Sequence, residues 1–292
     1  GDEEMAVINR TQVAIIDFQG RTVLKETESN QWDLVMDEKA GCTHFTLKEI
    51  FEQPWAVQET VLGRASLESG QVFLGELEIP DDRLRAVDRI IILACGTSWH
   101  SALVGKFLIE QIVGVPVEVD YGSEYRYRNP IVTPTTLAVV ITQSGETADT
   151  LAALRYAKEQ GQKILAIVNV PESTIARESD AVLHTNAGPE VGVASTKAFT
   201  TQLTVLGCLA IRVAKARGAI DAETEARLVG ALTEVPARAA EVLNHDERLR
   251  ELAEEIAKAR DVLYLGRGTS YPIALEGALK LKEISYIHAE GY

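Results

Sequence analysis

The chain has 292 residues, of which 46% are hydrophobic and 25% are charged, the composition of an ordinary globular protein of about two domains. A net charge of −14, from 29 Lys and Arg against 43 Asp and Glu, argues against nucleic acid and anionic membranes as main partners. This charge still allows a phosphate ligand that hydroxyl and backbone N–H groups bind locally.

Cysteines, histidines and apolar runs limit the kinds of site and compartment. The three cysteines form an odd, widely spaced set, which indicates a reducing compartment rather than a disulfide framework, and we expect a cytoplasmic protein. Cys42 and His44 lie close together, but two ligands do not make a zinc site, and we predict neither a metal nor a cofactor. No apolar run approaches ~18 residues, so no membrane span is predicted. The acidic first residues, GDEEMAVIN, do not form a secretory signal.

The N-terminal segment, residues 1–47, is predicted to be β structure. Residues 13–18 (VAIIDF) are rich in β-branched side chains, and residues 22–24 are a candidate partner strand. These strands are too few to bury a core alone, so they either pack on the rest of the chain or are the tail of another domain. Residues 48–88 are predicted to be a polar, helical connector, in which Pro54 marks a break or a helix start rather than a helix interior.

From residue 89 onward, short runs of Val, Ile and Leu alternate with amphipathic segments. The runs lack polar alternation, which is typical of strands that are covered on both faces. Strands and helices in this order predict right-handed βαβ units and an α/β fold with a parallel sheet flanked by helices. The predicted strands are residues 89–94, 115–120, 137–142, 164–169 and 181–184, and the predicted helices are residues 98–113, 147–160, 195–216 and most of 222–259.

A repeat joins the two ends of this region. Residues 89–110 (RIIILACGTSWHSALVGKFLIE) align without gaps on residues 261–282 (DVLYLGRGTSYPIALEGALKLK), with more identities than chance provides. The offset of 172 residues corresponds to a domain rather than to a solenoid repeat. The second copy reaches Tyr292 just after its first strand and helix, whereas the first copy continues through four more strand-like runs. We therefore expect a complete first domain, a second domain that is cut short, and a cut at the N-terminal end as well.

The first candidate site is the turn of residues 142–147 (TQSGET), between a predicted strand and a predicted helix. Gly145 lets the backbone approach a ligand closely, and the helix N-terminus offers unpaired N–H groups and the positive end of its dipole. With the polar side chains of the turn, this arrangement can bind a phosphomonoester without lysine. Helix capping by Ser144 and Glu146 is the alternative, but it leaves the other polar residues unexplained. The polar residues of the proposed phosphate site are Thr142, Gln143, Ser144 and Thr147.

Two further segments can face the same ligand. The turn of residues 95–98 (CGTS) follows another predicted strand, and the carboxyl ends of parallel strands line one crevice. No base is positioned near Cys95 by the sequence, so a small buried side chain explains it better than a nucleophile, and the G-x-G-x-x-G pattern of dinucleotide sites is absent. The loop of residues 188–197 (GPEVGVASTK) leads into a helix that starts at Ser195 or Thr196. It is either a simple helix entry or a loop that closes over the ligand.

The predicted helix of residues 271–289 carries an unusual charged stripe. The helix is apolar nearly all round, so we expect it to be largely buried. Glu276, Lys280 and Glu283 nevertheless share one face, at positions i, i+4 and i+7. Buried charges need partners or a function. Two interpretations remain open: a Glu276–Lys280 ion pair that stabilises the helix, and a carboxylate held near a lysine for proton transfer.

Several long motifs of the chain resemble one known family. ACGTS, TQSGETADT, TNAGPEVGVASTKAFTTQL, LGRG and ALEGALKLKEISYIHAE together resemble the glucosamine-6-phosphate synthases, the isomerizing glutamine–fructose-6-phosphate aminotransferases. The segment KEIFEQP resembles that family's junction between its glutaminase and isomerase halves. The resemblance covers almost the whole chain. It implies the conversion of fructose 6-phosphate and glutamine to glucosamine 6-phosphate and glutamate.

The resemblance also implies a domain organisation. It makes residues 1–47 the C-terminal remnant of a glutaminase domain, residues 48–79 a linker, and residues 80–220 a complete first sugar isomerase (SIS) domain. Residues 221–250 become a helical connector, and residues 251–292 become the truncated start of a second SIS domain. The implied fold is an SIS-type, flavodoxin-like three-layer α/β arrangement, and the full-length protein is expected to be a homodimer.

The resemblance gives nine residues roles at one site. Glu283 matches the carboxylate that moves a proton between C1 and C2 of the sugar, and Lys280 matches the lysine near it. Val193 and Ser195 match the loop beside the sugar. Thr142 stands where the family often has serine, which keeps the hydroxyl group. The matches to the sugar-phosphate contacts are Ser98, Thr142, Gln143, Ser144 and Thr147.

Three catalytic elements of the family are expected to lie outside this chain: the nucleophilic N-terminal cysteine, the ring-opening histidine and the Schiff-base lysine. We therefore expect the parent protein to be an enzyme and the chain alone to be catalytically incomplete, with glutamine bound only through the missing glutaminase domain. A non-catalytic SIS-domain sensor of sugar phosphates is the alternative. The charged stripe favours the enzyme, because a sensor has no need for a buried base. A plain structural α/β domain leaves the hydroxyl-rich turns unexplained.

Overall fold

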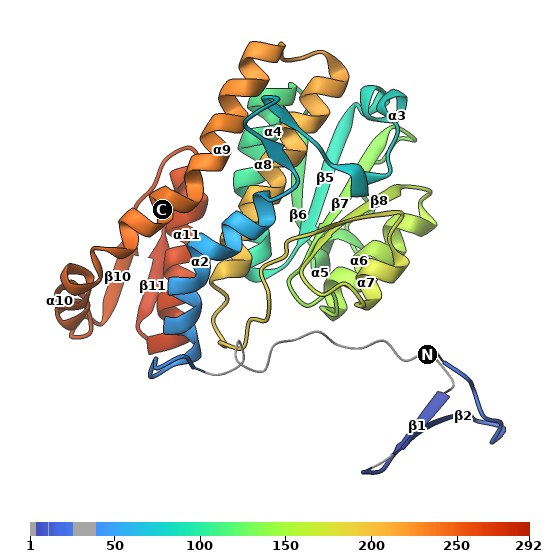
Figure 1. Ribbon diagram of the computed structural model, residues 1–292, viewed down its shortest axis with the longest axis horizontal. Coiled ribbons are helices and arrows are strands. Elements are labelled where there is room, and N and C mark those ends of the chain that lie inside the picture. The colour runs from blue at the N-terminus through green and yellow to red at the C-terminus, as the bar shows by residue number, and fades with distance from the viewer. Residues whose placement is uncertain (1–3, 11, 26–38) are drawn as a thin grey trace. The chain divides into compact units, whose positions relative to one another are not determined.

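The computed structural model describes residues 4–10, 12–25 and 39–292, and the chain divides into two compact units at residues 38 and 39 (Figure 1). In the first unit, β1 (Glu4–Ile8) pairs with β2 (Val13–Asp17) in an antiparallel ladder. The strand predicted at residues 13–18 is confirmed. The partner expected at residues 22–24 is reduced to one bridge between Ile16 and Thr22, on the edge of β2 that does not pair with β1. Residues 26–38 of the predicted β segment lie outside the described residues.

The second unit is built on a five-stranded parallel sheet, as the sequence predicts. Its strand order is β6-β5-β7-β8-β9. All four neighbouring pairs run parallel. Strands β5 and β7 are buried along nearly their whole length, because helices cover both faces of the sheet. The strands are β5 (Arg89–Ala94), β6 (Val117–Tyr121), β7 (Thr136–Ile141), β8 (Lys163–Val168) and β9 (Ala181–His184).

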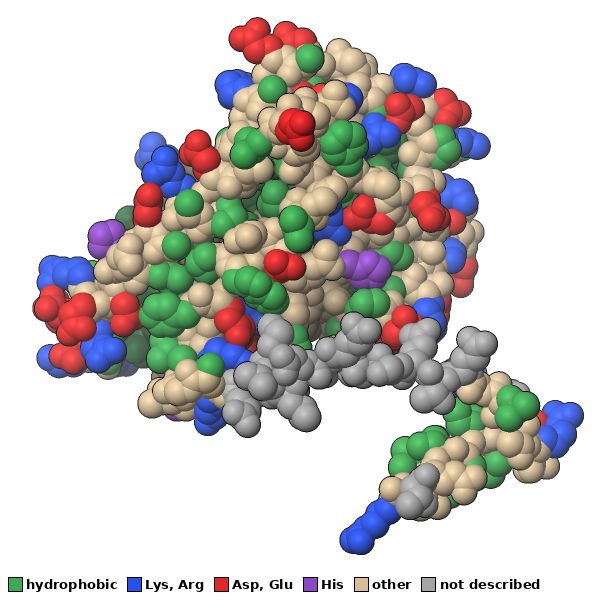
Figure 2. Space-filling view, in the orientation of Figure 1, with side chains coloured by type: hydrophobic (Ala, Val, Ile, Leu, Met, Phe, Trp, Pro, Cys, Tyr) green, Lys and Arg blue, Asp and Glu red, His purple; other side chains and the backbone are tan. Residues whose placement is uncertain are grey.

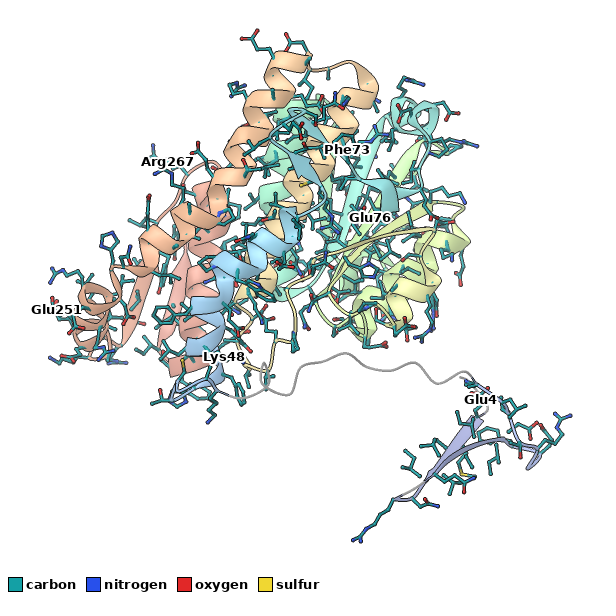
Figure 3. All side chains as sticks on the ribbon, viewed as in Figure 1. Glu4, Lys48, Phe73, Glu76, Glu251 and Arg267 are labelled. Atoms are coloured by element: carbon teal, nitrogen blue, oxygen red, sulfur yellow. The ribbon has the colours of Figure 1, made fainter. Side chains whose placement is uncertain are left out.

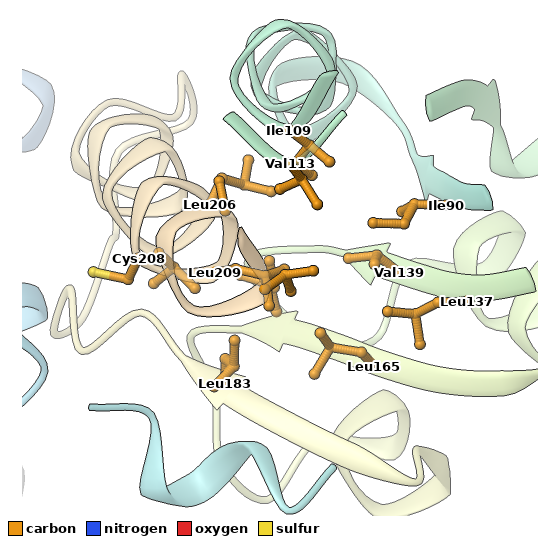
Figure 4. Close-up of a cluster of buried hydrophobic side chains, with 14 of the residues drawn as sticks. Ile90, Ile109, Val113, Leu137, Val139, Leu165, Leu183, Leu206, Cys208 and Leu209 are labelled. Carbon is orange, nitrogen blue, oxygen red and sulfur yellow. The ribbon is translucent and has the colours of Figure 1, made fainter. Parts of the chain in front are cut away.

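Two helical layers enclose this sheet, so the expected three-layer α/β architecture is confirmed. One face packs against α4 (Gly96–Val113), α8 (Lys197–Arg217) and the short α3 (Asp81–Ala86) (Figure 1). Figure 4 shows this apolar cluster, in which side chains of α4 and α8 meet those of the strands. The other face packs against three helices around the buried Tyr125. They are α5 (Gly122–Tyr125), α6 (Ala148–Glu159) and α7 (Thr174–Glu178).

Helix α2 (Phe45–Val61) precedes the sheet and packs against α8 and α9 (Ala222–Leu243). It contains Pro54 in its interior, so the prediction of a break or helix start there is wrong. Proline has no N–H for the carbonyl four residues earlier, which belongs to Ile50. The side chain of Gln53 donates to that carbonyl at 3.2 Å and replaces the missing bond. After α2 come β3 (Ala65–Ser66), β4 (Gln71–Val72) and the single turn η1 (Gly75–Leu77).

The C-terminal part begins with two further helices and then repeats the strand–helix order of β5 and α4. The helix predicted at residues 271–289 ends earlier, because Tyr286 takes a left-handed conformation and residues 288–291 form a strand parallel to β10. The expected deep burial is also wrong: α11 packs chiefly on β10, β11 and α4, and much of its surface is exposed. These elements are α9 (Ala222–Leu243), α10 (Asp246–Ile256), β10 (Asp261–Tyr264), α11 (Ser270–Ser285) and β11 (His288–Gly291).

A hydrophobic groove lies on the surface between α2 and α9. Trp55 and Leu62 of the α2 side face Pro236 and Ala240 of α9 across it. Figure 2 shows hydrophobic side chains gathered over these helices. Within the described residues, none of the helices combines the length and the apolar character that crossing a membrane requires.

Candidate active site

A cavity of about 200 Å³ lies at the carboxyl edge of the sheet, where β5 and β7 end. All nine residues that the sequence assigns to the site line it. They come from four segments distant in the chain, which the parallel order of the strands and the packing of α8 and α11 bring together. The nine residues are Ser98, Thr142, Gln143, Ser144, Thr147, Val193, Ser195, Lys280 and Glu283.

The turn after β7 presents hydroxyl groups at the start of α6. Gly145 has a φ of +69°, and its N–H donates to Thr142 Oγ1 at 3.3 Å. Thr142 Oγ1 lies 3.1 Å from Thr147 Oγ1, so the two hydroxyls form one pair. The first N–H groups of α6 lack acceptors within the helix and are available beside these hydroxyls.

The capping interpretation of this turn is wrong in both of its residues. The N-cap of α6 is Thr147 rather than Ser144, and Ser144 Oγ instead accepts from the N–H of Glu146 at 3.2 Å. Glu146 does not stabilise the first turn of α6, because its carboxylate accepts the N–H of Thr174, at the start of α7, at 2.7 Å. The polar residues of the turn are therefore not consumed by capping of α6.

Ser98 is held in place by a residue that the sequence does not single out. Gln202 of α8 donates from Nε2 to Ser98 Oγ at 2.9 Å, and its Oε1 accepts from Ser101 Oγ at 2.8 Å. Because Ser98 accepts in this bond, its own proton remains available for an acceptor in the cavity. Ser98 and Gln202 are 104 residues apart, so only the packing of α4 on α8 reveals the pair.

The loop of residues 188–197 is ordered around Glu190. The carboxylate accepts the N–H of Thr196 at 2.8 Å, the N–H of Ala198 at 3.1 Å and the hydroxyl of Ser195 at 2.9 Å. Glu190 thus caps α8, whose N-cap is Thr196, one of the two starts that the sequence predicts. Val193 projects from the loop beside the cavity and is 97% exposed.

The charged stripe of α11 meets α4 at the rim of the cavity. Lys280 Nζ lies 2.6 Å from Glu283 Oε2 and 3.4 Å from Glu276 Oε1, which confirms the predicted ion pair. Lys280 also donates to Thr97 Oγ1 at 3.0 Å, and Thr97 donates to Glu276 Oε1 at 2.9 Å. His100 Nδ1 lies 2.7 Å from the other oxygen of Glu276.

Burial differs along this stripe. Glu276 is buried, as predicted, but the Glu283 side chain is 36% exposed, so the expectation of a buried base is wrong for that residue. The Glu283 carboxylate lines the cavity beside the Lys280 ammonium group, where it can accept a proton from a ligand. The cavity is therefore lined both by the hydroxyl-rich turn of residues 142–147 and by the Glu283 carboxylate.

Cys95, Thr97 and His100 also lie at or beside the cavity. Cys95 lines the cavity, and its Sγ accepts from Thr150 Oγ1 at 3.7 Å, an arrangement that supplies no base for a nucleophile. Thr97 was visible to sequence reasoning, since the repeat keeps it as Thr269. His100 gave no such signal, because the repeat has a proline there. The described residues contain no group of three or more His, Cys, Asp or Glu side chains placed to hold a metal ion.

Comparison with known proteins identifies the family to which the chain belongs. The family model described as the SIS domain matches residues 83–212 and 255–292. Glutamine–fructose-6-phosphate aminotransferases (isomerizing) from Methanosarcina acetivorans and Chlorobaculum tepidum are 50% and 51% identical to the whole chain. The chain spans 47% of each, so it covers about half the length of these curated relatives.

A solved structure agrees with this assignment. The C-terminal domain of glucosamine-fructose-6-phosphate aminotransferase from Francisella tularensis matches with a TM-score of 0.83 and 42% identity, over 87% of this chain and 71% of that one. A phosphosugar isomerase of Silicibacter pomeroyi, so described provisionally, matches with a TM-score of 0.68 and 28% identity, over 85% of this chain and 71% of that one. The chain therefore belongs to the SIS domain family and, within it, to the glutamine–fructose-6-phosphate aminotransferases, whose SIS half it represents.

Proposed function

We propose that this chain is the sugar-phosphate-binding isomerase part of an enzyme that converts fructose 6-phosphate and glutamine to glucosamine 6-phosphate and glutamate. One observation carries the proposal: residues assigned to the site from four separate segments line a single cavity. The names of the curated relatives support the choice of substrates.

The cavity divides into a phosphate end and a sugar end. At the phosphate end, Ser98 and the turn of residues 142–147 offer hydroxyl groups, and the N-terminus of α6 offers N–H groups. At the sugar end, Val193 and Ser195 border the ligand. The proposal needs no lysine for the phosphate, so it assigns Lys280 to the sugar end of the cavity.

Glu283 is the proposed base for the isomerisation. It takes a proton from C1 of the open-chain ketose and returns it to C2, which leaves the base unchanged at the end of the step. Lys280, whose Nζ lies 2.6 Å from Glu283 Oε2, is placed to stabilise the negative charge that develops on the substrate oxygen.

The proposal assigns glutamine hydrolysis to a separate glutaminase domain. Cys95 lines the cavity, but its Sγ accepts a hydrogen bond from Thr150, and no base lies beside it among the described residues. The proposal places the complete enzyme in the cytoplasm as a homodimer. The three cysteines are unpaired, which supports a reducing compartment.

Calorimetric titration with fructose 6-phosphate tests the proposal. Hydrogen bonds to a charged phosphate contribute on the order of 1.5–3 kcal/mol each. The double variant Ser144→Ala/Thr147→Ala should therefore weaken binding more than tenfold. A matched double variant, Thr43→Ala/Ser69→Ala, removes two exposed hydroxyl groups outside the cavity and should bind as the unmodified chain does. Equal affinity of the two double variants would remove the phosphate assignment.

A further inference from the structure

Helix α2 places a buried carboxylate directly under the loop that borders the sugar end of the cavity. Glu49 is only 2% exposed. Its Oε1 accepts the N–H of Val191 at 2.6 Å and the N–H of Gly192 at 2.9 Å. These residues immediately precede Val193, which lines the cavity. Burying a carboxylate is costly unless hydrogen bonds compensate for the lost water. For Glu49 these hydrogen bonds come from the loop backbone.

The second oxygen of this carboxylate shows how closely the loop approaches α2. Glu49 Oε2 is buried and has no hydrogen-bond partner among the described residues. A Cβ atom added at Gly192 would lie 2.4 Å from this oxygen and 2.8 Å from Thr46 Oγ1. The φ of Gly192 is not in the left-handed region, so a larger side chain there is disfavoured by this close approach and not by backbone strain.

A second bond ties the far end of the loop to the same helix. Lys197, which is 1% exposed, donates to Glu52 Oε2 at 2.7 Å. Lys48 lies 3.5 Å from the other oxygen of Glu52. Val193 and Ser195 therefore lie between two attachments to α2, one at residues 191–192 and one at Lys197.

The C-terminal end of α2 is attached to the start of the same segment. Thr60 Oγ1 donates to the carbonyl of Thr185 at 2.6 Å, and Arg64 donates to the carbonyl of His184 at 2.5 Å. Arg64 is held in turn by Glu76 at 2.7 Å. Lys48 and Glu76 are labelled in Figure 3 and mark the two ends of this arrangement. The segment from β9 to α8 is thus bonded to α2, and to Arg64 just after it, at residues 184–185, 191–192 and 197.

We propose that Glu49 is a positioning residue for the sugar end of the cavity. Through Val191 and Gly192 it sets where Val193 and Ser195 lie, while the phosphate end is built by the start of α4, the turn after β7 and the start of α6 without it. This inference rests on the proposed function, because it assigns the sugar part of a hexose phosphate to this end. Loss of Glu49 should then weaken binding of the sugar but not of phosphate alone.

Two ligands separate these ends experimentally. In the 292-residue chain, Glu49→Ala should lower affinity for fructose 6-phosphate roughly tenfold, since the loop must then be ordered by the ligand itself. Affinity for inorganic phosphate, followed by NMR titration, should stay within twofold. Amide hydrogen exchange at residues 190–193 should speed up in the same variant. Glu49→Gln keeps an oxygen acceptor for both N–H groups and should restore most of the affinity and protection.

Matched variants exclude a general effect on folding. Glu59 lies on α2 and makes no hydrogen bond or ion pair with the described part of the chain, so Glu59→Ala should behave as the unmodified chain. Gly192→Ala attacks the same contact from the loop side and should reproduce Glu49→Ala. In the Glu49→Ala background Gly192→Ala should cost less than it does in the unmodified chain, because the Glu49 carboxylate is gone and only the contact with Thr46 Oγ1 remains.

The outcomes distinguish this inference from the proposed function. If the unmodified chain binds fructose 6-phosphate and Glu49→Ala binds it equally well, the positioning role is wrong and the proposed function stands. Equal losses of sugar phosphate and inorganic phosphate, without rescue by Glu49→Gln, would also overturn it, since they indicate a loss of folded protein. If the unmodified chain binds neither ligand, the proposed function fails and this inference fails with it.

Discussion

His100 Nδ1 lies 2.7 Å from Oε2 of Glu276, in a contact in which both side chains are largely buried. The pair joins α4 to α11, the helices of the two copies of the internal repeat. Thr97 and Lys280 complete the group on the other oxygen of the same carboxylate. Glu276 is thus the common acceptor at the junction of the two copies.

Removing this acceptor should destabilise the chain. Glu276→Ala leaves the partners from α4 and Lys280 without their shared acceptor, and we expect a loss of about 3 kcal/mol in the free energy of unfolding. Glu276→Gln keeps a carbonyl oxygen and should lose less. Urea denaturation measures both. The control Glu251→Ala breaks an exposed ion pair with Arg248 and should lose less than about 1 kcal/mol. Equal stability of Glu276→Ala and this control would contradict the prediction.

The assignment of Glu283 as base predicts a kinetic result. In a protein that joins this chain to a glutaminase domain, Glu283→Gln should slow amino-sugar formation by about 10²–10⁴-fold. Exchange of deuterium from solvent into fructose 6-phosphate should slow equally, while sugar-phosphate affinity changes little. Glu247→Gln, on the exposed surface of α10, is the control. Full activity of Glu283→Gln would instead leave the chain as a binding module.

The turn at Gly145 should tolerate no side chain. Its φ is +69°, and a Cβ atom there would lie 1.9 Å from Ser173 Oγ. Gly145→Ala should therefore cost more than Gly161→Ala, where φ is +78° but the space is open and a cost of about 1–2 kcal/mol is expected. Thermal unfolding compares the two. The double variant Gly145→Ala/Ser173→Gly should recover the steric part of the loss but not the conformational part.

The buried His184 should make stability depend on pH. Burial, with a smaller contribution from nearby Arg64, lowers the pKa of His184 below its ordinary value of 6.5, and its Nε2 has no partner in the described structure. The unfolded chain therefore binds a proton more readily than the folded one. The contribution of neutral His184 to the free energy of unfolding is fully present above about pH 6.5, and it is lost as the pH falls below that value. Melting temperatures between pH 7.5 and 5.5 should fall less in His184→Gln than in the exposed control His245→Gln.

Local patterns were sufficient for the sheet and for much of the site. Runs such as residues 89–94 and 137–142 contain β-branched and aliphatic residues without polar alternation. This pattern is typical of a strand that is covered on both faces. The turn of residues 142–147 follows one of these runs directly, so its place at the carboxyl edge follows from the order of strand and helix.

Long-range contacts were beyond the sequence. Glu49 and Val191 are 142 residues apart, and His100 and Glu276 are 176 apart, so neither pair has a local signal. The predicted break at Pro54 was wrong because the side chain of Gln53 replaces the lost backbone hydrogen bond. Helix propensities do not include such side-chain compensation.

The internal repeat bears on how this fold acquired a composite site. The alignment that superposes the two copies places Val104 opposite Glu276 and Leu108 opposite Lys280, so the charged stripe belongs to the second copy alone. Thr97, in the first copy, binds both charged residues across the junction. The two copies therefore differ in sequence at this position and contribute different side chains to the same group of contacts. The cavity of this chain therefore depends on both copies: the first supplies the hydroxyl groups and the second supplies the charged stripe.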